Sequence, residues 1–153
     1  MSFTLLALLC LILMVVALSI KRIPEGQVYS LHRLGRPPRL LTPGTHVVLP
    51  LLERVAHKIS LCGRTLRLDE TLTNGAAPRA VRATLYWQVL DPARAETVIE
   101  GADALLRARA QTALLTIDPE APARERNAAL KQALNVSLEM HGLLVTRIDA
   151  ELG

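Results

Sequence analysis

The side chains best suited to acid–base or metal chemistry are four histidines, and their spacing forms no recognised motif. No two of them have the separation of paired zinc ligands, and neither cysteine lies at zinc-finger spacing from them. The chain also lacks a Gly-x-Ser-x-Gly elbow, a P-loop and a Gly-x-Gly-x-x-Gly turn. The histidines are His32, His46, His57 and His141.

Two further candidates for chemistry have structural explanations. His46 follows the turn Pro43-Gly44, and we expect it to close that turn by a hydrogen bond. Asp69 and Glu70 are adjacent, so on a strand they would face opposite sides and make a poor acid–base pair. The sequence therefore predicts no enzymatic activity, no cofactor and no metal site.

The most distinctive feature of the chain is a run of eighteen residues, Phe3 to Ile20, without a charge, a proline or a glycine. As an α-helix this run would be about 27 Å long, close to the roughly 30 Å of a bilayer's hydrocarbon core. Seven of the residues are leucine, which favours insertion. We therefore predict a transmembrane anchor over residues 1–22. Its membrane-facing and interfacial residues are Phe3, Leu5, Leu9, Leu13, Val16, Ile20, Lys21 and Arg22.

A cleaved signal peptide is the alternative interpretation of this run. Small residues at Ala17-Leu18-Ser19 would suit a cleavage site, and removal of residues 1–19 would leave a secreted soluble binding domain. However, no Lys or Arg precedes the run, and it exceeds the roughly 7–15 apolar residues of a signal peptide. Lys21 and Arg22 follow it instead. By the positive-inside rule they predict a single-pass protein of the cell membrane with its domain on the cytoplasmic side.

The net charge of +4 is unevenly distributed along the chain. Residues 21–82 contain eleven Lys and Arg against four acidic residues, whereas residues 83–153 contain seven against ten. The basic part adjoins the predicted anchor, which suits an anionic lipid surface, where each nearby cation contributes about 1 kcal/mol. Only four aromatic residues are present, so we expect no nucleic-acid binding. The excess of Arg over Lys and the many alanines favour a GC-rich bacterial source.

The segment from residue 23 to residue 90 has the pattern of short strands and turns. In its clearest strand, Ala80–Leu90, polar residues alternate with an apolar face that we expect to be buried. That face consists of Val81, Ala83, Leu85, Trp87 and Val89. Other predicted strands are Gln27–Arg33, Val55–Leu61 and Thr65–Leu68, with a hairpin turn at Asn74-Gly75.

The second half of the chain changes to helical spacing. Asp91-Pro92 combines a capping side chain with proline at the first helical position, and Gly142 suits a helix C-terminus. Predicted helices run from Pro92 to Ile117, bent near Gly101, and from Pro122 to Met140; a last strand runs from Leu143 to Ile148. The inner face of the second helix should carry Leu130, Ala133, Leu134 and Leu138. This order predicts an α+β fold with an antiparallel or mixed sheet and two to three helices.

Several segments have a familiar order and spacing. They include Ile23-Pro24-Glu25-Gly26-Gln27-Val28, Leu41-Thr42-Pro43-Gly44-Thr45-His46, Trp87-Gln88-Val89-Leu90-Asp91-Pro92 and Gly142-Leu143-Leu144-Val145-Thr146-Arg147-Ile148. Together they resemble the stomatin-type SPFH (band 7) domain of the stomatin/prohibitin/flotillin superfamily. The resemblance covers nearly all of residues 1–151 and places that domain at 23–151, after the anchor at 1–22.

The resemblance implies a scaffold. Family members oligomerise beneath a membrane, organise lipids and restrain partners such as membrane proteases, and they continue after this domain into a long Ala/Glu-rich helix that drives ring or cage assembly. It thus implies membrane lipids, copies of this chain or related subunits, and an integral membrane protein as partners. A monomeric lipid-binding adaptor is the alternative.

One segment suggests how the domain meets lipid. The apolar loop Val47, Val48, Leu49, Pro50, Leu51 and Leu52 is interrupted by a proline, so we expect it to dip into the adjacent leaflet. Basic residues around it would then contact lipid head groups; these are Arg33, Arg36, Arg39 and Arg54. In the alternative, Val47 to Leu49 form an edge strand packed in the core.

Overall fold

The computed structural model describes residues 2–33, 35–48, 53–73, 78–118 and 120–152, which form two compact units, Met1–Ser60 (unit 1) and Leu61–Gly153 (unit 2). The described strands form three sheets, and every strand pair in them is antiparallel. Several helices accompany them, so the predicted α+β class is confirmed. The turn predicted at Asn74-Gly75 lies outside the described residues.

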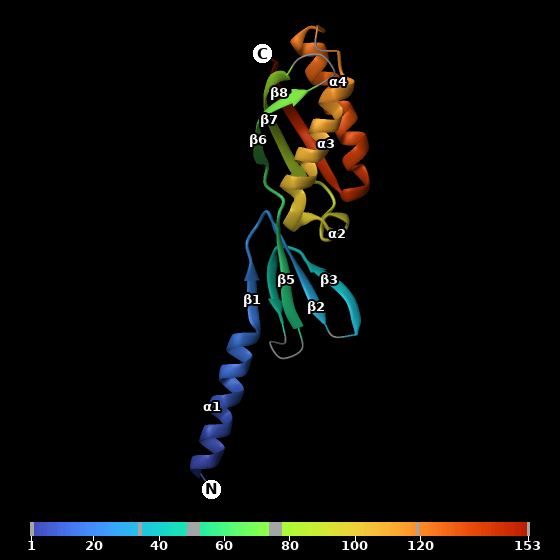
Figure 1. Ribbon diagram of the computed structural model, residues 1–153. Coiled ribbons are helices and arrows are strands. Elements are labelled where there is room, and N and C mark those ends of the chain that lie inside the picture. The colour runs from blue at the N-terminus through green and yellow to red at the C-terminus, as the bar shows by residue number, and fades with distance from the viewer. Residues whose placement is uncertain (1, 34, 49–52, 74–77, 119, 153) are drawn as a thin grey trace. The chain divides into compact units, whose positions relative to one another are not determined.

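Unit 1 begins with α1 (Ser2–Ser19), which continues directly into β1 (Ile20–Ile23) (Figure 1). Strand β1 pairs with β4 (Gly44–Val47) in a two-stranded ribbon. At the junction the Ser19 hydroxyl donates to the Val15 carbonyl at 2.7 Å, and the Ser19 carbonyl accepts a hydrogen bond of 2.8 Å from the Val48 amide. Because Ser19 is held in this way, the helix ends there.

The prediction of a transmembrane helix over residues 1–22 is corrected accordingly. Residues 20–23 are extended, so Lys21 and Arg22 belong to a strand rather than to the end of a helix. No helix in the described part of the chain combines the length and the apolar character needed to cross a membrane.

The second sheet of unit 1 has the order β3 (Arg36–Leu41), β2 (Gln27–Arg33) and β5 (Glu53–Ser60). The bounds of β2 are those predicted from the sequence. Buried apolar residues from the sheet and the β1–β4 ribbon meet in one cluster, with Tyr29 packed against it. The cluster contains Ile23, Leu31, Leu41 and Val48. It joins the strand that follows α1 to the sheet.

Two local features of unit 1 concern a proline-containing strand and a histidine beside a turn. Strand β3 was not predicted, since Pro37 and Pro38 argue against a strand; they are accommodated because β3 lies at the edge of its sheet. The role predicted for His46 is confirmed: its Nε2 lies 2.8 Å from the Thr42 carbonyl, across the turn.

Unit 2 contains a sheet of order β6 (Arg64–Thr73), β7 (Pro78–Val89) and β8 (Leu143–Leu152). The returning strand β8 pairs with β7, the strand with the clearest alternation. The five residues predicted to form the inner face of β7 are all buried, with exposed fractions between 1% and 5%. On β6, Leu66 and Leu68 share that buried face.

The helices of unit 2 cover the buried face of this sheet (Figure 1). The chain first forms α2 (Pro92–Ala95) and the 3-10 turn η1 (Ile99–Gly101). Next, α3 (Ala102–Thr116) packs against α4 (Ala123–Leu138) and β6. The 3-10 turn η2 (Glu139–His141) then leads into β8. The first predicted helix is therefore broken near Gly101, as the sequence indicates. The second buries Leu130, Leu134 and Leu138, but Ala133 is exposed, which corrects one residue of its predicted inner face.

Polar side chains attach α4 to the edge strand β8. The Asn135 amide donates to the Val145 carbonyl at 3.1 Å and accepts from the Val145 amide at 2.8 Å. Buried Arg126 donates to the Ala150 carbonyl at 3.1 Å. These bonds satisfy backbone groups of an edge strand, which would otherwise be costly to bury.

The predicted helix signals at Asp91 and Gly142 are both confirmed. The Asp91 carboxylate accepts from the amides of Ala93 and Arg94, with Pro92 at the first helical position. Gly142 ends η2 with a φ of 64°, and its carbonyl accepts from the amides of Leu90 and Asp91. A Cβ at Gly142 would collide with the Asp91 carbonyl oxygen.

We predict that Gly142→Ala lowers the free energy of unfolding of unit 2 by roughly 3 kcal/mol, because the new Cβ adds a steric clash to left-handed strain. Gly101→Ala is the matched control: Gly101 has a φ of −105°, and a Cβ added there would meet no atom within 4 Å. Denaturant unfolding followed by fluorescence of the single, buried Trp87 measures both variants. Equal stability of the two would contradict the prediction.

A carboxylate on β6 binds α3 to the sheet. Glu70 accepts a hydrogen bond of 3.0 Å from Arg107 and another from Gln111. The hydrogen bond from Gln111 is the main cause that lowers the pKa of Glu70; partial burial opposes it, and Arg107 adds to the lowering. Neighbouring Asp69 instead lies 3.7 Å from Arg82, with 78% of its side chain exposed. The two adjacent carboxylates therefore serve different partners, as their positions on a strand predict.

We predict that Glu70→Gln destabilises unit 2 by about 1 kcal/mol at neutral pH. Because the folded state lowers the pKa of Glu70, its contribution is complete above the unfolded value of 4.5 and is lost as the pH falls through the folded pKa. The difference between the wild type and Glu70→Gln should therefore shrink below pH 4.5. Asp69→Asn is the control and should change stability little. A difference that stays constant at acidic pH would contradict the assignment.

Candidate functional site

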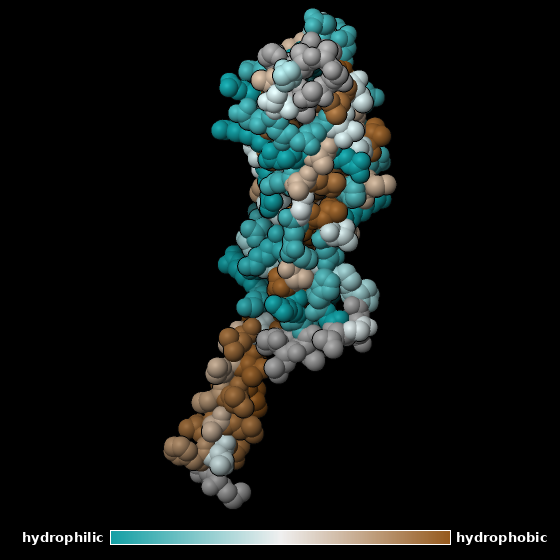
Figure 2. All heavy atoms as spheres, viewed as in Figure 1, coloured by the Kyte–Doolittle hydropathy of each residue, from teal (hydrophilic) through white to brown (hydrophobic). Residues whose placement is uncertain are grey.

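The surface of α1 is apolar on every side. Each Leu, Ile, Val, Met and Phe from Phe3 to Leu18 has an exposed fraction between 44% and 86%. Figure 2 shows this as a continuous apolar surface along the helix, in contrast with the mostly hydrophilic strands that follow it. A helix that is apolar all round normally has its surface covered, either by a protein core or by hydrocarbon. Among the described elements of unit 1, α1 contacts chiefly β1, the strand that follows it.

Basic residues follow this helix in unit 1. Residues 21–60 contain seven Lys and Arg against two acidic residues, Glu25 and Glu53, whereas unit 2 contains eleven against twelve. Lys21 and Arg22 are exposed on β1, directly after α1. The positive charge of unit 1 is therefore adjacent to the apolar helix in sequence and in structure.

The structure brings together two of the four arginines predicted to contact head groups. Arg33 and Arg39 line a small cavity of about 190 Å³ together with Leu31, Pro37 and Glu53. Strand register explains the grouping: Leu31 on β2 pairs with Arg39 on β3, and Arg33 pairs with Glu53 on β5. The Arg33 Nη1 lies 4.0 Å from the Glu53 Oε1.

Arg54 is not among the residues that line this cavity. Arg54 pairs across the strands with His32, which alternates with Arg33 along β2, so it faces the opposite side of the sheet. The backbone of Arg36 pairs with Arg33, while its side chain lies outside the described residues.

The cavity is tethered to the end of α1. The Val48 amide bonds to the Ser19 carbonyl, and Glu53 lies five residues further along the chain. Five residues span at most about 17 Å when fully extended. The end of the sheet that carries Arg33 and Glu53 therefore stays close to the end of the apolar helix.

The predicted membrane-dipping loop is divided by the structure. Val47 is 72% exposed at the end of β4, but Val48 is 5% exposed and belongs to the core of unit 1. Val48 therefore cannot contact lipid while this core is intact. Leu49, Pro50, Leu51 and Leu52 lie outside the described residues.

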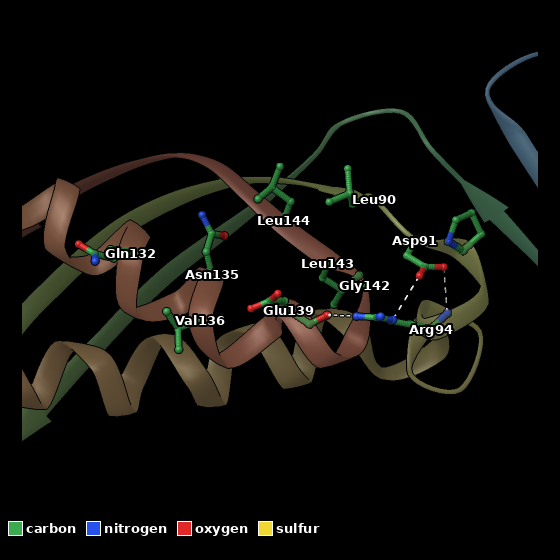
Figure 3. A pocket seen from close by; sticks show the side chains of 11 residues that line it. Leu90, Asp91, Arg94, Gln132, Asn135, Val136, Glu139, Gly142, Leu143 and Leu144 are labelled. Carbon is green, nitrogen blue, oxygen red and sulfur yellow. Dashed lines mark hydrogen bonds and ion pairs between the residues drawn. The ribbon is translucent and has the colours of Figure 1, made fainter.

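Unit 2 contains a larger hollow of about 770 Å³ between α4, the start of β8 and the start of α2 (Figure 3). Leu90 and Val136, 67% and 71% exposed, line it together with Leu144. At one end Arg94 joins Asp91 at 3.3 Å and the Glu139 carbonyl at 3.5 Å, as the dashed lines show. The hollow thus combines an apolar lining with charged groups of both signs.

The hollow was missed in the sequence analysis, although a signal for it exists. Val136 is 71% exposed on the outward face of α4, although it is an apolar residue. Leu90 similarly is an exposed apolar residue, directly after the last residue of β7. Its position on the rim depends on the close approach of Gly142 to Asp91, which only the tertiary structure shows.

The side chains considered for catalysis remain dispersed. The rings of His32 and His57 lie edge to face with centroids 6.4 Å apart, while His46 caps its turn and His141 ends η2. Within the described ranges, no three His, Cys, Asp or Glu residues are grouped in a way that could hold a metal ion.

Comparison with known proteins places this structure in a family. The profile of the SPFH domain / Band 7 family matches residues 21–125, from β1 into α4. The chain belongs to this family. It is thereby a member of the stomatin/prohibitin/flotillin superfamily, whose members are generally non-enzymatic scaffolds associated with membranes.

Individual relatives support the assignment. An uncharacterized protein of Schizosaccharomyces pombe is 31% identical over 84% of this chain and 39% of its own length. Human mitochondrial stomatin-like protein 2 is 25% identical over 83% of this chain and 38% of its own length. A stomatin homolog of Pyrococcus horikoshii is 27% identical over 93% of this chain and 56% of its own length. The chain thus spans from just under two-fifths to just over half of the length of these relatives.

Proposed function

We propose that this SPFH domain is part of a membrane-attached scaffold, held at the bilayer by α1 and stabilised there by the basic residues of unit 1. The observation that carries the proposal is the exposure of α1 on all its sides. Burying a single leucine side chain is worth about 1.5–3 kcal/mol, so exposing this whole helix to water would be strongly unfavourable. Insertion of α1 into hydrocarbon removes that cost.

Electrostatics support the same placement. Lys21 and Arg22 directly follow α1, at the point where the chain would meet the lipid head groups. The cavity that contains Arg33 and Arg39 is held near this point by the hydrogen bond between Val48 and Ser19. On an anionic surface each such cation contributes about 1 kcal/mol, and the contribution falls with salt. We further propose that both units lie on the cytoplasmic side of the cell membrane, because the anionic lipids of the cytoplasmic leaflet attract basic residues next to the membrane.

The role of α1 is tested by placing a charge in its middle. An aspartate near the centre of a membrane-inserted helix costs about 3 kcal/mol, so Leu9→Asp should lower the partition coefficient of the full chain into vesicles about 100-fold. Flotation with liposomes measures this. Leu115→Asp, which charges an exposed apolar position of α3 in unit 2 that lies outside the hollow, is the matched control and should float like the wild type.

Undiminished flotation of Leu9→Asp would contradict the role of α1. N-terminal sequencing of the protein isolated from membranes adds a second check. A chain that begins after Ser19 would support the alternative of a secreted soluble domain.

We also propose that copies of this chain, or related subunits, assemble side by side on the membrane. Membership of the SPFH family supports this, as does the apolar hollow of unit 2, because exposed apolar surface rimmed by charges is typical of protein contacts. Chains confined to one membrane also meet at high effective concentration. An assembly of this kind could hold an integral membrane protein, such as a protease, among its subunits.

Assembly through the hollow predicts a change in mass. Light scattering of the full chain in mild detergent should give a discrete multiple of its 16.7 kDa after subtraction of the detergent. Val136→Asp should shift the mass toward the monomer, because it places a charge within the apolar contact. Leu115→Asp, at an exposed apolar position of α3 outside the hollow, should leave the mass unchanged. A monomeric wild type would instead favour the lipid-binding adaptor.

A further inference from the structure

We propose that the cavity formed by Arg33, Arg39 and Glu53 binds an aminoalkyl phosphate, the head-group chemistry of phosphatidylethanolamine. The inference rests on the proposed membrane attachment and names the lipid that unit 1 selects there. The phosphate would lie against the guanidinium groups, and the primary ammonium would donate to the Glu53 carboxylate.

The charges of the cavity favour a ligand that carries both signs. A bare anion would meet the Glu53 carboxylate, which has 17% of its side chain exposed, and an isolated cation would meet Arg33 and Arg39. A molecule that carries both signs satisfies both ends. Among the described residues Arg39 forms no hydrogen bond or ion pair, and the Arg33–Glu53 distance of 4.0 Å is longer than a hydrogen bond. Both arginines therefore keep donors for a phosphate.

The carboxylate has the capacity for an additional donor. Two carboxylate oxygens offer about four acceptor positions, so Glu53 can hold an ammonium while it keeps its contacts within the protein. The three N–H groups of a primary ammonium suit this geometry. A trimethylammonium group has no N–H to donate, and a glycerol head group has no positive charge. The chemistry therefore favours phosphatidylethanolamine over phosphatidylcholine and phosphatidylglycerol.

The size and position of the cavity agree with a head group. Its volume of about 190 Å³ is smaller than the pockets of about 300–1,000 Å³ that enclose drug-sized ligands. Leu31 and Pro37 supply apolar contacts for a short alkyl segment. The hydrogen bond between Val48 and Ser19, together with the five residues from Val48 to Glu53, keeps the cavity near the end of α1, where a membrane surface would lie. These features favour a lipid over a free metabolite.

The test titrates the full chain in mild detergent micelles with phosphatidylethanolamine or phosphatidylcholine that have the same acyl chains. The side-chain N–H resonances of Arg33 and Arg39 report binding by NMR. We expect phosphatidylethanolamine to bind with an about tenfold lower apparent Kd, which corresponds to about 1.4 kcal/mol. Because this comparison uses the wild-type chain, it does not depend on a variant that folds. Equal affinity for the two lipids would overturn the proposal.

Variants then locate the selectivity. Glu53→Gln should remove the preference for the primary ammonium, and Arg39→Gln should weaken both lipids. Glu25→Gln, which changes the other acidic residue of unit 1, is the matched control and should retain the preference. The proposal would also be overturned if the preference for phosphatidylethanolamine survives Glu53→Gln. Chemical-shift changes confined to Arg54, on the opposite face of the sheet, would overturn it as well.

Soluble phosphoethanolamine distinguishes the source of the ligand. It should shift the same two resonances at much higher concentration than the lipid, and binding as tight as that of the lipid would overturn the assignment to a membrane. The titration in micelles tests the cavity, and the flotation of Leu9→Asp tests attachment by α1, so each proposal can be contradicted without the other. A negative titration with normal flotation removes the cavity's role but leaves attachment by α1, whereas the reverse result removes attachment and leaves a head-group cavity.

Discussion

The pairing of β1 with β4, together with the hydrogen bond from the Val48 amide to the Ser19 carbonyl, is the constraint on which the rest of unit 1 depends. It ends α1 at Ser19 and converts the following residues from a helical continuation into a strand. It also brings Ile23 and Val48 into the same core as Leu31 of the neighbouring sheet. An apolar helix is thereby joined to a folded unit through backbone hydrogen bonds and packing rather than through a free linker.

The two units divide the physical properties of the chain between them. Unit 1 combines the apolar helix with the whole excess of positive charge, and a membrane surface attracts both. Unit 2 is close to neutral, encloses its own core under α3 and α4, and exposes apolar side chains only at scattered described positions such as the hollow. This division suits an SPFH scaffold that attaches through one surface and meets other proteins through another.

The sequence predicted correctly those elements whose structure is determined by residues close together in the chain. The alternation of β7, the cap at Asp91 and the turn at Gly142 depend on neighbours in sequence, and all three are confirmed. Features that depend on distant partners were missed or misplaced. Pro37 and Pro38 can lie in a strand because β3 is at the edge of its sheet. Lys21 and Arg22 lie in a strand, and not in the helix, because they pair with β4. Likewise, strand register brings Arg33 and Arg39 to one cavity and places Arg54 on the opposite face of the sheet.

The two native cysteines allow the most direct test of the central claim, that α1 lies in hydrocarbon while the strands that follow it face water. Cys10 in α1 and Cys62 before β6 are both free and exposed in the structure. In intact vesicles, a membrane-impermeant maleimide should label Cys62 rapidly and leave Cys10 unmodified until the bilayer is dissolved and the chain is denatured. Labelling of Cys10 at the rate of Cys62 in intact vesicles would contradict the insertion of α1.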